Sequence, residues 1–226
     1  IWGPIEYDMS NAESGPNDGK QMTVNGITYA RGIGAHATAA ISYNLGGQFL
    51  NFVSDVGPDD ETSGTVIFKL IGDGVALNTT TKLTKAKAPY RMFQRVWGVN
   101  VFELDVLDGG DGNGGDHADF AGAYFTHPVS SLTVSKKSMD ILVGTSDNVD
   151  ITVVADASVP QGATCSISDP AVATVTGTGS SCAVTALTSG VTYLTIVAKA
   201  TSYFTTTIPV MVSAPRVWKM AMSQSQ

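Results

Sequence analysis

The chain has 226 residues, of which 43% are hydrophobic and only 15% are charged, and it contains 24 Gly and 9 Pro. This composition predicts compact, turn-rich domains and excludes a disordered chain or a long-helix protein. Thirteen Lys and Arg against 20 Asp and Glu give a net charge of −7, which disfavours nucleic acid and anionic membrane surfaces as partners. Because no apolar run approaches the roughly 20 residues that cross a bilayer, we expect no membrane insertion.

The chain begins with Ile1 rather than Met, without a basic segment followed by an apolar one. We interpret it as a processed or excised piece of a larger parent polypeptide.

The charge changes abruptly at His127-Pro128. Up to Pro128 there are 8 Lys and Arg and 15 Asp and Glu, for −7; from Val129 onward there are 5 of each, for 0, and no Glu. Such a change indicates two domains with different surfaces. We predict domains at 1–128 and 129–213, followed by a tail or linker at 214–226.

Both parts show the pattern of an all-β fold, in which short runs of β-branched and aromatic residues alternate with Gly, Asn and Asp clusters. The strands expected in the first part are 21–24, 27–30, 41–45, 49–56, 65–71, 93–97, 101–107 and 120–125. Asn25-Gly26 predicts a tight hairpin, since both turn residues need a positive φ. No window of twelve residues keeps a 3.6-residue apolar stripe, so no substantial helix is expected.

The second part contains many short strands in some 85 residues, which predicts an immunoglobulin-like sandwich. The expected strands are 132–134, 139–143, 149–154, 163–167, 173–175, 183–187, 191–199 and 204–212. Cys165 and Cys182 lie 17 residues apart in this part. An even count in an apparently exported β protein favours a disulfide between two strands, and two buried thiols remain the alternative.

Alternating chain direction predicts where the polar connections of the first domain lie. If the chain starts upward along 2–8 and reverses at each turn, the long polar connections fall at one end. These connections are 10–20, 32–37, 57–64, 82–89 and 108–119, and the short turns, Asn25-Gly26 among them, fall at the opposite end. Loops that a rigid scaffold displays together commonly carry binding function, so we expect a binding face there.

An acidic, glycine-rich loop resembles a calcium-binding loop, with oxygen ligands separated by Gly. It runs from Asp108 through Asp111 to Asp116, and it is not an EF-hand, since it lacks both a Glu at the twelfth position and flanking helices. An irregular loop without metal is the alternative, because such loops also favour Asp, Asn and Gly. A second stretch could serve a calcium ion equally well: Asn11, Glu13 and Asp18.

Asp59, Asp60 and Glu61 place three carboxylates on one turn. Glycoside hydrolysis needs two carboxylates across a cleft, and a small meander sandwich rarely forms one. Hydrogen bonds to ligand hydroxyls, a metal or solvation are therefore favoured over catalysis. His36 and His117 are expected at the same end, as structural histidines or as donors to a sugar hydroxyl, because no third zinc ligand is local. The aromatic residues that could stack on a sugar are Trp2, Tyr90, Trp97, Phe120 and Tyr124. Phe120 adjoins the last loop, so it is the better candidate.

Five stretches resemble the NPCBM domain, also called carbohydrate-binding module family 51, in order and at the usual spacing over 1–126. They are 2–11 (WGPIEYDMSN), 29–37 (YARGIGAHA), 52–61 (FVSDVGPDDE), 108–113 (DGGDGN) and 116–123 (DHADFAGA). The resemblance implies a discoidin-like β-sandwich (a jelly roll), a bound calcium, and binding of galactose or blood-group glycans by a non-catalytic appendage of a glycoside hydrolase. The family commonly has Trp where Phe120 stands and Asp where Gly122 stands, so this chain departs from the family pattern at two positions.

Residues 129–213 resemble a bacterial Ig-like domain of group 2, through Leu132-Thr-Val, the stretch 168–175 (SDPAVATV) and the stretch 186–196 (ALTSGVTYLTI). Such domains are commonly spacers or adhesive modules of exported, cell-surface and phage proteins. The resemblance therefore implies an extracellular, cell-surface or virion-surface location.

The hypothesis that follows is a non-catalytic glycan-binding protein that recognises a terminal galactose-type sugar, with calcium in a structural role and an Ig-like spacer. The alternative is a structural or assembly subunit of a surface filament, a virion decoration or an adhesin, since a weakly charged chain suits self-assembly. A self-contained glycosidase is the least favoured hypothesis.

Overall fold

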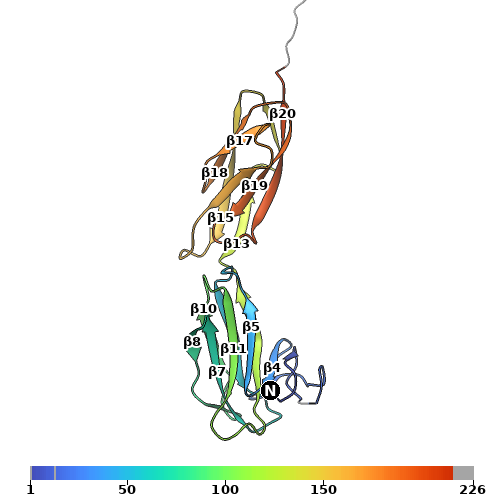
Figure 1. The fold of residues 1–226 in the computed structure, drawn as a ribbon, viewed down its shortest axis with the longest axis vertical. Coiled ribbons are helices and arrows are strands. Elements are labelled where there is room, and N and C mark those ends of the chain that lie inside the picture. The colour runs from blue at the N-terminus through green and yellow to red at the C-terminus, as the bar shows by residue number, and fades with distance from the viewer. Residues whose placement is uncertain (1, 13, 216–226) are drawn as a thin grey trace, which may run out of the picture. The chain divides into compact units, whose positions relative to one another are not determined.

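The structure is a computed structural model that describes residues 2–12 and 14–215, and it divides into two compact units (Figure 1). Unit 1 is Ile1–His127 and unit 2 is Pro128–Gln226. The described residues form strands and turns without a helix, which confirms the all-β prediction. Within these same residues, no helix has the length and apolar character to span a membrane. The predicted tail 214–226 lies outside the described residues from position 216 onward.

Unit 1 is a sandwich of two antiparallel sheets. The first sheet has the order β1 (Glu6–Tyr7), β4 (Gly32–His36), β12 (His117–Thr126), β6 (Asn51–Pro58) and β10 (Tyr90–Arg95). The second has the order β5 (Ala39–Asn44), β11 (Val101–Asp108), β7 (Thr65–Gly72) and β8 (Val75–Thr79), and β9 (Leu83–Thr84) also pairs with β7. The core between the sheets contains four fully buried phenylalanines: Phe52, Phe68, Phe102 and Phe120.

The predicted hairpin forms, but its position differs from the prediction. β2 (Thr23–Val24) and β3 (Ile27–Thr28) pair around Asn25-Gly26, whose φ values are 49° and 77°. The backbone amides of Asn25 and Gly26 donate to the Asp60 carboxylate, at 3.0 and 2.6 Å. The hairpin turn therefore lies beside the long polar loops and not at the opposite end, because these two strands stand outside both main sheets.

The segment 32–37, predicted as a loop, contains β4, and every residue of β4 is buried. Glycine at position 34 allows the backbone of Met9 and Ser10 to pack directly on β4, because a Cβ at Gly34 would collide with that backbone. β1 pairs antiparallel to β4, with Glu6 opposite Gly34 and Tyr7 opposite Ile33. The first strand therefore runs opposite to the predicted direction, which moves the start of the chain to the His36 end of the sandwich.

Unit 2 is built from two four-stranded sheets. The first has the order β13 (Val129–Val134), β15 (Ser146–Ala155), β18 (Ser181–Ala186) and β17 (Ala173–Thr176). The second has the order β14 (Met139–Leu142), β20 (Thr205–Ser213), β19 (Gly190–Ala198) and β16 (Ala163–Ile167), with β14 parallel to β20. A disulfide joins Cys165 on β16 to Cys182 on β18, so it connects the two sheets.

Candidate functional site

The long loops of unit 1 meet at one end of its sandwich, which we call the loop end, at the lower end of unit 1 in Figure 1. Here β4, β6 and β11 finish and β5, β7 and β12 begin. His36 is the register partner of His117. The backbone amide of Asp59 donates to the His117 carbonyl at 3.0 Å, and that of Gly64 donates to the Gly115 carbonyl at 3.0 Å. The turn 59–64 and the loop 109–116 are therefore held side by side.

Two histidines and one tryptophan form an aromatic cluster at the loop end. The rings of His36 and His117 meet edge to face, with centroids 5.3 Å apart. Trp2 stacks on His36, with centroids 6.0 Å apart, and is itself 61% exposed. His36 is buried and its Nδ1 lies 2.7 Å from the Ala37 carbonyl. The Trp2 ring is therefore packed on the buried His36 and is largely exposed at the loop end.

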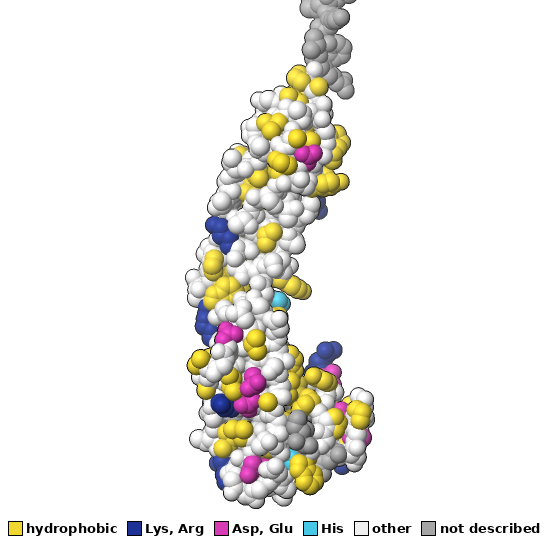
Figure 2. Space-filling model, in the orientation of Figure 1, with side chains coloured by type: hydrophobic (Ala, Val, Ile, Leu, Met, Phe, Trp, Pro, Cys, Tyr) yellow, Lys and Arg dark blue, Asp and Glu magenta, His cyan; other side chains and the backbone are white. Residues whose placement is uncertain are grey.

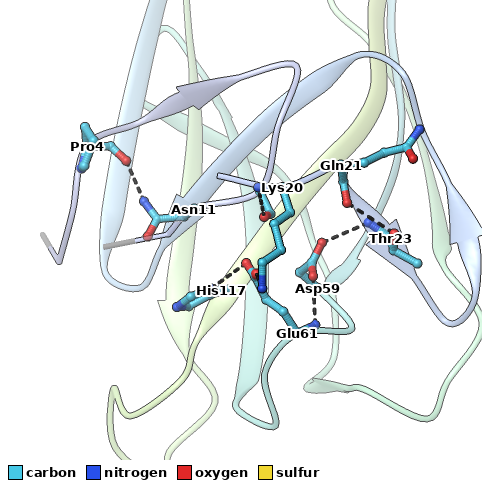
Figure 3. A network of polar contacts seen from close by, with 9 residues as sticks. Pro4, Asn11, Lys20, Gln21, Thr23, Asp59, Glu61 and His117 are labelled. Carbon is cyan, nitrogen blue, oxygen red and sulfur yellow. Dashed lines mark hydrogen bonds and ion pairs between the residues drawn. The ribbon is translucent and has the colours of Figure 1, made fainter. Parts of the chain in front are cut away.

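Charged side chains continue this cluster across the loop end (Figure 3). Glu61 Oε1 lies 3.0 Å from His117 Nδ1, and Glu61 Oε2 lies 3.7 Å from Lys20 Nζ. The Lys20 side chain is 80% exposed, whereas that of Glu61 is 16% exposed. The buried His117, the partly buried Glu61 and the exposed Lys20 thus form a row of polar groups that leads to the surface, and such groups can hydrogen-bond to hydroxyls.

Asp59 and Asp60 hold the N-terminal hairpin in place through backbone amides. Asp59 is buried, and its carboxylate accepts from the backbone amides of Thr23 at 2.9 Å and Glu61 at 2.8 Å. Asp60 accepts from the hairpin turn, as described above. Of the three carboxylates predicted to meet a ligand, Glu61 has the geometry for contact at the surface, because the other two are occupied by backbone amides.

Phe120 does not have the geometry of a stacking residue, and that prediction is wrong. Its side chain is fully buried and packs edge to face on Phe68, with centroids 4.9 Å apart. The alternation of side chains along β12 points Phe120 into the core. The exposed aromatic at this end is Trp2, which the sequence reasoning placed at the opposite end because it assigned the first strand the wrong direction.

The predicted calcium ligands are only partly brought together. Asp108 Oδ1 accepts from the amides of Gly110 and Asp111, and Asp111 Oδ1 accepts from the Thr65 hydroxyl. Asp116 is buried, and neither of its carboxylate oxygens has a hydrogen-bond partner in the structure. Burial, and then the carboxylates of Asp108 and Asp111, raise the pKa of Asp116.

A complete carboxylate cage is not formed. Among the described residues, no group of three His, Cys, Asp or Glu side chains is arranged to hold a metal ion. The second predicted set does not converge, since Asn11 is buried with its Nδ2 on the Pro4 carbonyl at 2.5 Å while Asp18 is exposed. Glu13 lies outside the described residues. Of the predicted ligands, only those of the acidic loop therefore lie close to one another.

A buried carboxylate that the sequence reasoning did not select lies close to the loop end. Asp119 is fully buried opposite Gly34 and Gly57, and its carboxyl group lies beside that of Asp59. Burial, and then the neighbouring carboxylate of Asp59, raise the pKa of Asp119 well above its usual value. The sequence could have indicated the side of the sheet on which Asp119 lies. Asp119 and Phe120 are adjacent on β12, so they point to opposite faces, and the apolar Phe120 is the one that faces the core. The N-terminal segment covers the outer face where Asp119 lies, since a Cβ at Gly34 or Gly57 would collide with Ser10 or Val24.

Comparisons with known proteins concern mainly unit 1. The model of the NPCBM/NEW2 domain family matches residues 1–126. A stretch of 137 residues is 34% identical to a protein of Renibacterium salmoninarum provisionally named an endo-alpha-N-acetylgalactosaminidase. This match covers 59% of the chain and 9% of that protein, so the chain spans less than a tenth of that relative's length.

Two solved structures from Clostridium perfringens are similar. One is CBM51 from GH95 in complex with methyl-galactose, 31% identical over 56% of this chain and 90% of that chain, with a TM-score of 0.51. The other is the M60 catalytic domain with the CBM51-1 and CBM51-2 domains of ZmpB. It is 21% identical over 100% of this chain and 24% of that chain, with a TM-score of 0.53, and it shows a likeness of fold alone. The family model covers more than half of the chain and unit 1 has the sandwich of this CBM51 relative, so the chain belongs to the NPCBM/NEW2 domain family.

Proposed function

We propose that unit 1 is a non-catalytic glycan-binding module that recognises a terminal galactose-type sugar at the loop end. The observation that carries this proposal is the exposed Trp2 ring, supported by His36 and followed by the row of His117, Glu61 and Lys20. A pyranose has an apolar C–H face and a polar hydroxyl edge, and an aromatic ring beside charged donors and acceptors matches both. The relative that was solved with methyl-galactose is 31% identical and supports the choice of sugar.

The carboxylates at the loop end support a binding role over a hydrolytic one. Hydrolysis requires two carboxylates on either side of the scissile bond, one of them acting as a proton donor. Asp59 is buried under two backbone amides, and Glu61 is engaged with His117 and Lys20. The module would therefore deliver a catalytic region of a larger extracellular polypeptide to its glycan, and would not cleave that glycan itself.

Binding is tested by titrating the 226-residue chain with methyl galactoside in a calorimeter. We expect a Kd in the millimolar to high micromolar range, because one aromatic face and few hydrogen bonds must offset the cost of association. Trp2→Ala should weaken binding about tenfold, which is the upper end of what one aromatic contact contributes.

Phe93→Ala is the matched control for this titration, since Phe93 is a 62% exposed aromatic on β10, a strand of the same sheet. It should leave the affinity unchanged. Absence of binding to every galactoside on a glycan array, or full binding by Trp2→Ala, would reject the loop end as the sugar site.

We also propose a structural calcium ion at the acidic loop, with Asp116 as a ligand. The buried, unpartnered carboxylate beside Asp108 and Asp111 supports this, because a divalent cation offsets the mutual repulsion of such groups. Calcium should raise the unfolding temperature of the wild-type chain relative to chelator, and Asp116→Asn should abolish that rise. An equal unfolding temperature with calcium and with chelator would contradict the proposal.

Unit 2 is proposed to be an Ig-like spacer, from its two four-stranded sheets, its inter-sheet disulfide and the sequence resemblance described above. A role in assembly is the second candidate, and a row of exposed apolar residues on β19 and β20 favours it. Val191 is the register partner of Met211, and Tyr193 is the partner of Pro209. Val191, Tyr193 and Met211 are 55%, 49% and 52% exposed. Multimers in size-exclusion chromatography that dissociate in Tyr193→Ser would favour assembly, and a monomer would favour the spacer.

A further inference from the structure

A pocket of about 230 Å³ opens on the side of unit 1, formed by residues of β1, β4, β5, β6, β11 and β12 and the segments next to β1 and β4. It arises because β4 begins at Gly32, opposite Ala121, whereas β12 continues to Thr126. The pairing of β12 with β6 shifts between Ala121 and Tyr124, around Gly122 with a φ of 58°. The C-terminal half of β12 therefore has β6 on one side and the pocket on the other.

Tyrosines form the walls of this pocket. Tyr7 is 59% exposed and Tyr124 is 50% exposed, and the half-buried Tyr43 stands on the neighbouring β5. Burial, and then the adjacent Tyr7, raise the pKa of Tyr43 to about 12, so its hydroxyl stays protonated. The walls thus present aromatic faces together with hydroxyl groups that can both donate and accept.

The floor of the pocket is rigid and apolar. It is made by Phe52, Leu104 and Phe125, and the first two are buried. Phe125 packs against the rings of Phe52 and Tyr43, with centroids 5.2 and 6.4 Å apart. A floor fixed by aromatic packing means that the pocket is formed before a ligand arrives, which lowers the cost of binding.

Two oppositely charged side chains complete the lining. Arg31 is exposed, and its carbonyl accepts from the Gly122 amide at 2.7 Å, which fixes the backbone beside the bulge. Asp8 accepts from the Gly32 amide at 3.1 Å through Oδ1. Apolar walls with a few converging polar groups are typical of a small-molecule site. Adjacent positive and negative groups favour a neutral ligand that both donates and accepts hydrogen bonds over an anion.

We propose that this pocket is a second sugar-binding site, separate from the loop end, that takes one neutral pyranose ring between Tyr7 and Tyr124. Its volume lies below the ~300–1,000 Å³ of sites for drug-sized ligands, which limits the occupant to about one ring. The ligand class rests on the proposed function of unit 1, but the residues are different. Two sites on one module would let it bind a branched or clustered glycan with more than the affinity of either site.

The test is a titration of the ¹⁵N-labelled chain with methyl galactoside and with methyl glucoside, followed by amide chemical shifts. At about 20 mM sugar, well above a millimolar Kd, the amides of Gly32 and Ala123 should shift in a saturable manner with at least one of the two. Tyr124→Ala should weaken these changes about tenfold, and the folded spectrum should persist because Tyr124 is half exposed.

Two control variants separate the two sites. Trp2→Ala should leave the changes at Gly32 and Ala123 intact and remove those at Thr38 and Gly64, near the loop end. Phe93→Ala should alter neither set. Changes confined to the loop end would overturn the second site and leave the proposed function standing. Changes confined to the pocket would keep the second site and reject the loop end. Changes at Gly32 and Ala123 that survive both Tyr124→Ala and Arg31→Ala would also overturn the pocket.

Discussion

Both units are built from two β-sheets, but they differ in charge and in their connections. Unit 1 contains all of the net charge of −7, and its long polar loops meet at one end. Unit 2 has equal numbers of acidic and basic residues in the sequence, and its sheets are joined by a disulfide. Figure 2 agrees, since acidic side chains are more frequent on the visible face of unit 1 than on that of unit 2. The polar groups that could bind a ligand in a β-sandwich are therefore determined by the loops and strand edges, and not by the two packed sheets.

The largest effect is expected at Phe120, where the structure and the sequence-based hypothesis disagree. Phe120→Ala should cost about 3–5 kcal/mol in the free energy of unfolding, because it empties a fully buried position between the sheets. Trp2→Ala should change stability by less than about 0.5 kcal/mol, because Trp2 is mostly exposed. Calorimetric unfolding of the two variants measures both values. A stable Phe120→Ala variant that has lost sugar affinity would instead restore Phe120 as the stacking residue.

The disulfide should contribute to the stability of unit 2 and not to that of unit 1. Replacing both Cys165 and Cys182 with Ser should lower the stability of unit 2 by roughly 3 kcal/mol, the value expected for closing a loop of this length. Hydrogen exchange read separately over the two units should show faster opening in unit 2 only. Faster exchange in unit 1 as well would show that the two units do not unfold independently.

Asp119 should make unit 1 sensitive to pH. Its folded-state pKa is raised, so the folded protein holds this proton more tightly than the unfolded chain does. The stability contributed by the protonated form is complete below the unfolded pKa and is lost as pH rises through the folded pKa. Asp119→Asn should therefore raise the free energy of unfolding by about 1–3 kcal/mol at a pH above the folded pKa, the cost of an unsatisfied buried group.

That gain for Asp119→Asn should shrink as the pH falls toward 4, and denaturant unfolding in chelator at several pH values measures it. Asp59→Asn is not equivalent, because Asp59 accepts two backbone amides. A loss of stability in Asp119→Asn at neutral pH would contradict this prediction. It would show that the Asp119 carboxylate makes an interaction whose stabilising free energy exceeds the free-energy cost of its burial.

The smallest effect is expected at Lys20. Its side chain is 80% exposed and lies 3.7 Å from Glu61, so Lys20→Ala should change stability by at most about 0.5 kcal/mol. Its effect on methyl galactoside affinity decides whether the polar row takes part in binding. An affinity that is unchanged in both Lys20→Ala and Glu61→Gln would restrict the site to Trp2 and the histidines.

Much of the molecule follows from sequence because local rules decide it. The all-β class, the Asn25-Gly26 hairpin and the family of residues 1–126 depend on side-chain period, turn chemistry and motif spacing, which short segments carry by themselves. The approach of His36 to the 59–61 turn and to His117 also follows from the alternation of strand direction.

Tertiary structure alone decided which side chains are exposed at the loop end. The direction of β1 depends on its pairing with β4, a contact between segments about 27 residues apart, and this contact brings Trp2 onto His36. The burial of Asp119 depends on the N-terminal segment crossing the outer face of β12. The side pocket depends on β12 continuing to Thr126, past Ala121, which lies opposite the first residue of β4. Strand periodicity assigns a residue to one face or the other, but only the packed chain determines whether that face is covered.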